Sequence, residues 1–116
     1  MDVVNFITVE DGRDLILSFS FDDGTEFGID GFTIQRTPDL EYVLQPHEKG
    51  ASIDWTDDDE IILVTNVELS ADVIRIYSRP RNYAFDISGL DEDDRKRIMK
   101  ILKKMNFDDK FIFEIQ

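Results

Sequence analysis

The chain reads Leu-Ile-Leu-Ser-Phe-Ser-Phe over residues 15–21, and this stretch decides the class of fold. Large apolar side chains occupy its odd positions, and only Ile16 interrupts the polar side. Side chains alternate between the two faces of a strand, so this period of two predicts a strand with one buried face. Asp11-Gly12 before it and Asp23-Gly24 after it favour tight hairpin turns, so we expect the middle strand of a meander.

A similar alternation recurs along most of the chain. Residues 61–69 are expected to form a central strand, because both of their faces are largely apolar. Residues 51–55 are expected to form an edge strand, and Tyr42-Val43-Leu44 a short strand. Pro38 lacks a backbone donor and closes the region of the third strand. Further strands are predicted at residues 3–9, at 27–34 (continuous or interrupted at Asp30-Gly31), and at 73–77, 83–87 and 111–115.

One amphipathic helix is predicted after Asp91, which suits the N-cap and is followed by three acidic residues. A single apolar stripe with helical spacing runs along it, made of Ile98, Ile101, Leu102 and Met105. Lysines lie nearly opposite this stripe and in the last turns, where they suit the negative end of the helix dipole. Asn106 is expected to end the helix in a left-handed conformation.

These elements predict an α+β fold. Its main part is a mainly antiparallel sheet of roughly eight strands, which is either a curved sheet or a partly open barrel. One amphipathic helix lies near the C-terminus and is followed by a short strand. The 116 residues suit a single domain spanning 1–116, and nine phenylalanines provide material for a packed core. Phe32 and Trp55 lie in segments without a clear pattern, so the sequence leaves open whether they are core or exposed.

The composition excludes several kinds of protein. No cysteine is present, which excludes disulfides, thiolate metal sites and a cysteine nucleophile and favours a reducing compartment. The first residues lack the basic and apolar regions of a signal peptide, so a cytoplasmic location is expected. The longest aliphatic run, Ile61 to Val64, is far shorter than the roughly 20 residues of a membrane span.

Charge is unevenly distributed along the chain. The formal net charge is −13, which disfavours binding to nucleic acid because phosphate backbones are repelled. Residues 1–74 carry three basic and eighteen acidic residues, a net charge of −15, whereas residues 75–116 carry ten basic and eight acidic residues, a net charge of +2. This asymmetry favours association between surfaces of opposite charge.

No catalytic motif is found, and the chain is not expected to be an enzyme. His47 is the only histidine and lies in a Pro-His-Glu-Lys-Gly loop, which indicates an exposed residue. Phosphate-binding glycine motifs and the G-x-S-x-G elbow are absent, so no cofactor is predicted. The acidic run 57–60 lacks the spacing of an EF-hand, so no metal is predicted, although binding of a cation there stays open. Paired carboxylates in a cleft remain the least favoured alternative.

Basic residues of the C-terminal segment are the candidate binding residues. Arg75, Arg79 and Arg81 surround a predicted turn, and guanidinium groups bind carboxylates and phosphates through paired hydrogen bonds. Lys96 and Lys100 lie on the basic face of the helix, which lacks the aromatic residues of a nucleic-acid platform and the bulky apolar residues of a membrane-surface helix. The alternative for the three arginines is that they only neutralise the acidic surface of the domain. The alternative for the two lysines is a solvated helix face opposite the core.

Two functions are therefore expected, in order. The first is a non-enzymatic protein-interaction module that binds a protein partner or a second copy of itself, without nucleic acid or membrane. The second is a binding domain for a small anionic ligand at the Arg75/Arg79/Arg81 turn, which would require a concave pocket beside that turn.

Overall fold

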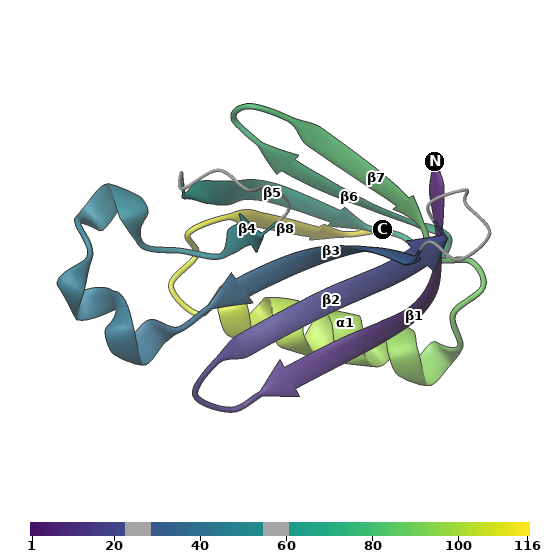
Figure 1. The fold of residues 1–116 in the computed structure, drawn as a ribbon, viewed down its shortest axis with the longest axis horizontal. Helices are drawn as coiled ribbons and strands as arrows, with labels where there is room; N and C mark the ends of the chain where they lie inside the picture. The colour runs from purple at the N-terminus through teal and green to yellow at the C-terminus, as the bar shows by residue number, and fades with distance from the viewer. Residues whose placement is uncertain (23–28, 55–60) are drawn as a thin grey trace.

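The computed structural model describes residues 1–22, 29–54 and 61–116. Within these residues the predicted α+β class is confirmed (Figure 1). Seven strands precede one helix, and a short eighth strand after the helix completes a mostly antiparallel sheet. The helix is α1 (Glu92–Met105), and the strands are β1 (Asp2–Asp11), β2 (Leu15–Asp22), β3 (Ile29–Arg36), β4 (Ser52–Asp54), β5 (Ile62–Leu69), β6 (Val73–Ser78), β7 (Asn82–Asp86) and β8 (Ile112–Ile115).

The stretch at residues 15–21 forms β2, the middle strand of the predicted meander. It pairs antiparallel with β1 on one edge and with β3 on the other, with Phe19 opposite Ile7 and Phe32. Its odd-numbered side chains are all buried and its even-numbered ones are half-buried, as the alternation predicted. Phe32 belongs to the core, because its ring is fully buried and lies 4.8 Å, centroid to centroid, from Phe85.

The strands form a ring. Their order is β4-β3-β2-β1-β7-β6-β5-β8, and an additional pairing of β4 with β5 closes the ring, with β8 beside β5 outside it. Two junctions are parallel, β1 with β7 and β5 with β8, and the others are antiparallel. The expected edge position of residues 51–55 is wrong, because β4 pairs with β3 on one side and with β5 on the other. The expected central position of β5 is confirmed, since it pairs with β6, β4 and β8.

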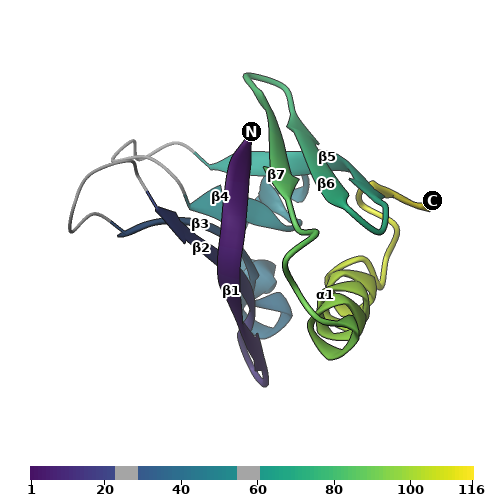
Figure 2. The same ribbon diagram turned by 90° about the vertical axis from the view of Figure 1, so that its right-hand side faces the viewer.

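Helix α1 packs its predicted apolar stripe onto the concave side of the sheet. Asp91 is the N-cap and accepts a hydrogen bond from the Asp94 N–H at 2.8 Å. The stripe residues Ile98, Ile101, Leu102 and Met105 are all buried, and the helix contacts β1 and β2. Figure 2 shows α1 between β1 and the C-terminal end of the chain, where it covers the open side of the curved sheet.

Local expectations in the connecting segments were less accurate. The strand expected at Tyr42-Val43-Leu44 is wrong: Pro38–Val43 forms the 3-10 helix η1, with Tyr42 and Val43 exposed. Pro38 suits the first turn of a helix because it has no N–H to leave unpaired, and the buried Glu41 directs this turn inward. A second short 3-10 helix, η2 (Pro46–Glu48), follows.

The end of α1 also differs from its expectation. Asn106 has φ −98° and is not left-handed, and the left-handed residue is instead Asp109 at φ 56°. The Asn106 side chain accepts a hydrogen bond from the Phe111 N–H at 3.1 Å, which directs the chain toward β8. The predicted turn at Asp23-Gly24, Trp55 and the acidic run 57–60 lie outside the described residues.

Candidate functional site

A cleft of about 730 Å3 opens on the outer side of β5, and we call it the basic cleft. Four segments that are distant in sequence line it: η2 and the residue after it, the start of β5, the turn between β6 and β7, and the loop before β8. Its lining consists of Pro46, His47, Lys49, Ile61, Ile62, Leu63, Val64, Thr65, Arg79, Pro80 and Lys110.

The alternation of β5 provides the apolar floor of the basic cleft. Val64 is buried in the core and Ile62 packs against it, so these two side chains face the interior. Leu63 has the opposite parity and therefore belongs to the outer face, and Ile61 directly precedes the strand. Ile61 is 48% exposed and borders both the basic cleft and a second hollow beside Arg36 and Glu41.

Gly50 brings two walls of the basic cleft close to its floor. Its φ of +147° is a conformation that side chains with a Cβ rarely adopt. A Cβ built on Gly50 would lie 3.7 Å from Leu63 Cδ2 and 3.8 Å from Lys110 Cβ. The segment that carries Lys49 therefore passes directly beside the segment that carries Lys110.

The charge of the basic cleft is opposite to that of the whole chain. Lys49, Arg79 and Lys110 line it, and no aspartate or glutamate does so among the described residues. None of these three cations forms an ion pair with a carboxylate of the described part of the chain. The chain has 26 acidic and 13 basic residues, so a lining whose described charged residues are all cations is a local reversal of its charge.

The predicted arginine cluster is separated by the structure. The Ser78 N–H and O–H both donate to the Arg81 carbonyl, at 2.9 and 2.6 Å, and this tight turn places Arg79 in the cleft lining. Arg81 is exposed and does not line the cleft. Arg75 lies on β6 opposite Glu68 of β5, four residues from Arg79, which corresponds to about 13 Å along a strand. The three arginines therefore do not form one site.

The two helix lysines also lie elsewhere. Both are exposed on α1, and Lys96 Nζ lies 3.7 Å from Glu92 Oε1 in a solvent-exposed pair of the kind that contributes little stability. Lys100 borders a separate small hollow of about 240 Å3, together with Arg97 and Asp11. Sequence reasoning missed Lys49 and Lys110, and it assigned His47 only to an exposed loop. No local pattern joins these residues, because the cleft is assembled from four segments.

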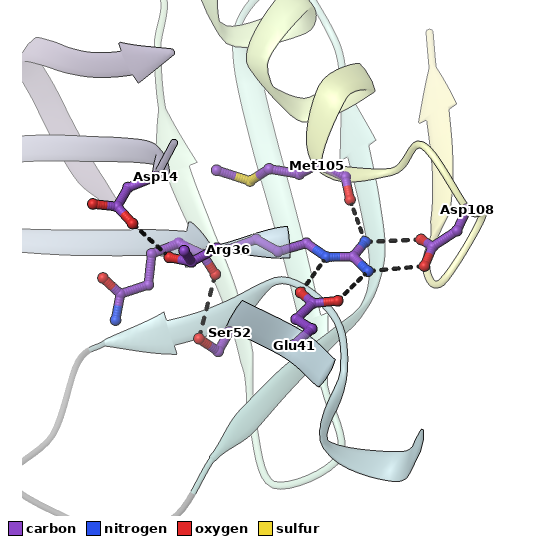
Figure 3. A network of polar contacts seen from close by, with 8 residues as sticks. Asp14, Arg36, Glu41, Ser52, Met105 and Asp108 are labelled. Carbon is purple, nitrogen blue, oxygen red and sulfur yellow. Dashed lines mark hydrogen bonds and ion pairs between the residues drawn. The ribbon is translucent and has the colours of Figure 1, made fainter. Parts of the chain in front are cut away.

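One buried arginine links segments that lead to two walls of the basic cleft. Arg36, at the end of β3, uses all five of its N–H donors, and we call this arrangement the Arg36 clamp (Figure 3). Two donors bind Glu41 at 2.7 and 2.8 Å, two bind Asp108 at 2.8 Å each, and one binds the Met105 carbonyl at 2.7 Å. The guanidinium also lies 4.3 Å from the centre of the Phe107 ring.

In the Arg36 clamp, the arginine and its carboxylate partners stabilise each other's charged forms. Burial by itself lowers the pKa of Arg36, but the hydrogen bonds and charges of Asp108 and Glu41 outweigh this and raise it above its ordinary value. The Arg36 hydrogen bonds in turn hold the pKa of Asp108 below its ordinary value. Glu41 lies on the segment that leads to η2 and Lys49, and Asp108 lies two residues before Lys110. The clamp therefore connects both lysine-bearing walls to β3.

Other kinds of site are not found in residues 1–22, 29–54 and 61–116. No helix in these ranges is long and apolar enough to cross a membrane. No three histidine or carboxylate side chains there lie close enough together to hold a metal ion. Comparison of the chain with protein families, with curated proteins and with solved structures finds no match.

Proposed function

We propose that the domain binds an anionic ligand in the basic cleft. Lys49, Arg79 and Lys110 supply the positive charge, and the observation that carries the proposal is their convergence on a cleft without carboxylates in the described chain, in a protein of net charge −13. Because none of these cations forms an ion pair with a described carboxylate, a ligand would not have to displace any of the described ion pairs to reach them.

The three cations would contribute in different ways. The two lysines carry compact charges on flexible stems, which can follow the position of an anion. The guanidinium of Arg79 offers a planar fork that binds carboxylate or phosphate oxygens in pairs. The apolar floor of the cleft would reduce the local dielectric constant and strengthen both interactions relative to open solvent.

Of the three arginines expected from the sequence to bind an anion, one lines the basic cleft. Arg79 stays a ligand-binding residue, and Arg75 and Arg81 are replaced by Lys49 and Lys110. We infer a binding function rather than catalysis, because the lining has a single histidine and no carboxylate beside it to act as its partner within the described residues.

A nuclear magnetic resonance titration tests the proposal. Inorganic phosphate, succinate and adenosine monophosphate are added to the labelled domain, and we expect selective amide shifts at residues 47–50, 61–65, 79 and 110. Substitutions Lys49→Ala, Arg79→Ala and Lys110→Ala should each weaken binding, and more so at low salt because screening is weaker there.

The matched control is Lys100→Ala, which removes the same charge from an exposed position on α1. It should leave the affinity unchanged apart from a small long-range effect. Amide shifts scattered over the whole surface, or an equal loss of affinity in Lys100→Ala and Lys110→Ala, would contradict a site in the basic cleft.

A second candidate, interaction with another protein, is favoured by the free edge of β8. This strand pairs only with β5 among the described strands, and Ile112 and Ile115 are 57% and 50% exposed. Glu114 lies beside Glu68 of β5 in the parallel register, so the outer face at this edge is acidic. An extended partner segment with basic side chains would complement it by adding a strand.

Synthetic peptides test this second candidate. A peptide of alternating valine and lysine should shift the β8 amides, a valine–glutamate peptide should not, and Glu114→Lys should reverse the preference. Equal response to both peptides would contradict it. Light scattering at low and at about 0.5 M salt tests self-association: a complex held by surfaces of opposite charge should dissociate as the salt rises, and a mass that does not change with salt would contradict it.

A further inference from the structure

We infer that the ligand of the basic cleft is an amphiphilic anion, in which a carboxylate or phosphate head is joined to a short unbranched apolar chain. This inference rests on the proposed function, because it specifies the kind of anion that the same cleft accepts. The evidence for the apolar chain is the set of apolar residues that line the cleft together with the cations.

The lining of the basic cleft is more apolar than a site for a simple ion requires. Four lining residues whose side chains do not face the core are aliphatic or proline: Pro46, Ile61, Leu63 and Pro80. An inorganic anion would contact the cations and leave the exposed surface of Ile61 in water. A ligand with an apolar chain would remove that surface from water, which is the dominant favourable contribution to most association.

The apolar floor lies between the cationic walls rather than apart from them. Lys110 and Leu63 are both neighbours of Gly50, and Arg79 and Pro80 reach the cleft from the β6–β7 turn. Cations from three separate segments therefore surround one aliphatic strand face. The anionic head group of such a ligand would contact the cations at the rim, and its apolar chain would cover Ile61 and Leu63.

The size of the cleft suits such a ligand. Its volume of about 730 Å3 lies within the range of roughly 300–1,000 Å3 that is usual for small-molecule sites. Phosphate or acetate would fill only a small part of it. Ile61 and Leu63 border part of the remaining space, so an added apolar chain has a surface to cover.

Isothermal titration calorimetry with a homologous series tests the inference. The probes are acetate, butanoate, hexanoate, octanoate and decanoate, all kept below the concentrations at which they form micelles, together with inorganic phosphate and decyl phosphate. We expect the affinity to rise about fourfold for each added CH2 group, the factor that corresponds to 0.8 kcal/mol, until the cleft is filled.

Two isoleucine variants show whether the chain lies in the cleft. Ile61→Ser should flatten the dependence on chain length and leave phosphate binding unchanged. Ile112→Ser is the matched control, because Ile112 is similarly exposed but lies on β8 outside the cleft lining. It should retain the full dependence on chain length. Both isoleucines are about half exposed, so both variants are expected to fold.

The outcomes separate the two proposals. Binding of acetate and phosphate that is sensitive to Arg79→Ala but independent of chain length would overturn the amphiphilic ligand and leave the anion site standing. No binding of any probe would overturn both. A dependence on chain length that survives Ile61→Ser would place the chain elsewhere and overturn the inference. So would an acidic leucine-containing peptide that binds more than tenfold tighter than decanoate, since it would identify a protein partner.

Discussion

Arg36 and Asp108 are separated by 72 positions in the chain, yet two guanidinium N–H groups donate to the two Asp108 carboxylate oxygens at 2.8 Å. This paired contact joins the end of β3 to the loop between α1 and β8. Glu41 takes a second pair of donors, so one side chain joins three segments that have no continuous secondary structure in common. Two of those segments lead to Lys49 and Lys110 in the basic cleft.

Replacement of Arg36 by methionine should lower the free energy of unfolding by about 3–5 kcal/mol. Methionine keeps part of the apolar volume, but the Glu41 carboxylate, whose side chain is 11% exposed, would be left without its cation. Urea unfolding followed by circular dichroism measures the loss. Arg75→Met is the control, because Arg75 is exposed on β6, and it should change the value by less than about 0.5 kcal/mol. A loss below 1 kcal/mol in Arg36→Met would show that the clamp does not stabilise the fold.

The contribution of Asp108 should depend on pH in the acidic range. Its pKa in the folded state lies below the ordinary value of 3.8, chiefly because Arg36 donates hydrogen bonds to its ionised form. A carboxylate with a lowered folded pKa contributes stability that is complete above about pH 5 and is lost as the pH falls through the folded pKa. The difference in free energy of unfolding between the native chain and Asp108→Asn should therefore be largest near pH 7 and shrink below about pH 4.

Asp109→Asn is the control for this pH dependence. Asp109 is exposed, forms no ion pair with the described residues, and has a positive φ that asparagine tolerates well. Its stability difference from the native chain should stay small and nearly constant from pH 7 to pH 3. Parallel curves for Asp108→Asn and the native chain would contradict a clamp that acts through the charge of Asp108.

The regular elements could be predicted because their patterns are local. The alternation in residues 15–21 fixed the buried face of β2, and the helical spacing of Ile98 to Met105 fixed the buried face of α1. Arg36 carries a signal of the same kind that was not used. Phe32 and Ile34 are the buried positions of β3, and the same period places Arg36 on that face, where an arginine requires ionic partners.

The closure of the ring and the basic cleft could not be predicted, because they depend on contacts between distant segments. Residues 51–55 look like an edge strand locally, and only the pairing of Ile53 with Ile62 shows that β4 joins β3 to β5. Lys49 and Lys110 have no common pattern, since their proximity depends on Gly50 and on the clamp. Arg79 is a candidate both from the sequence and from its place in the cleft, whereas Lys49 and Lys110 are candidates from the structure alone.

The N-cap of α1 should contribute a measurable part of the stability. Asp91→Ala removes the acceptor of the Asp94 N–H and is expected to lower the free energy of unfolding by about 0.5–2 kcal/mol. Asp91→Asn keeps an acceptor and should recover most of that loss. Asp93→Ala, which changes an exposed acid in the same first turn, serves as the control for charge alone. Equal losses in Asp91→Ala and Asp93→Ala, measured by urea unfolding, would show that the cap hydrogen bond contributes nothing beyond the helix dipole.

Gly50→Ala should both destabilise the fold and weaken ligand binding in the basic cleft. The space around Gly50 tolerates a methyl group, because an added Cβ meets Leu63 and Lys110 only at ordinary contact distances of 3.7 Å or more. The cost comes from the backbone, whose φ of +147° is unfavourable for alanine, and we expect a loss of about 1–3 kcal/mol in the free energy of unfolding. Relief of that strain would move Lys49 away from Lys110 and lower the affinity for phosphate.

Gly89→Ala is the matched control, because its φ is not in this range and nothing lies within 4 Å of an added Cβ. Its stability and its phosphate affinity should both stay unchanged. A stable Gly50→Ala variant with unaltered phosphate binding would show that the backbone turn at residue 50 does not set the spacing of the two lysines.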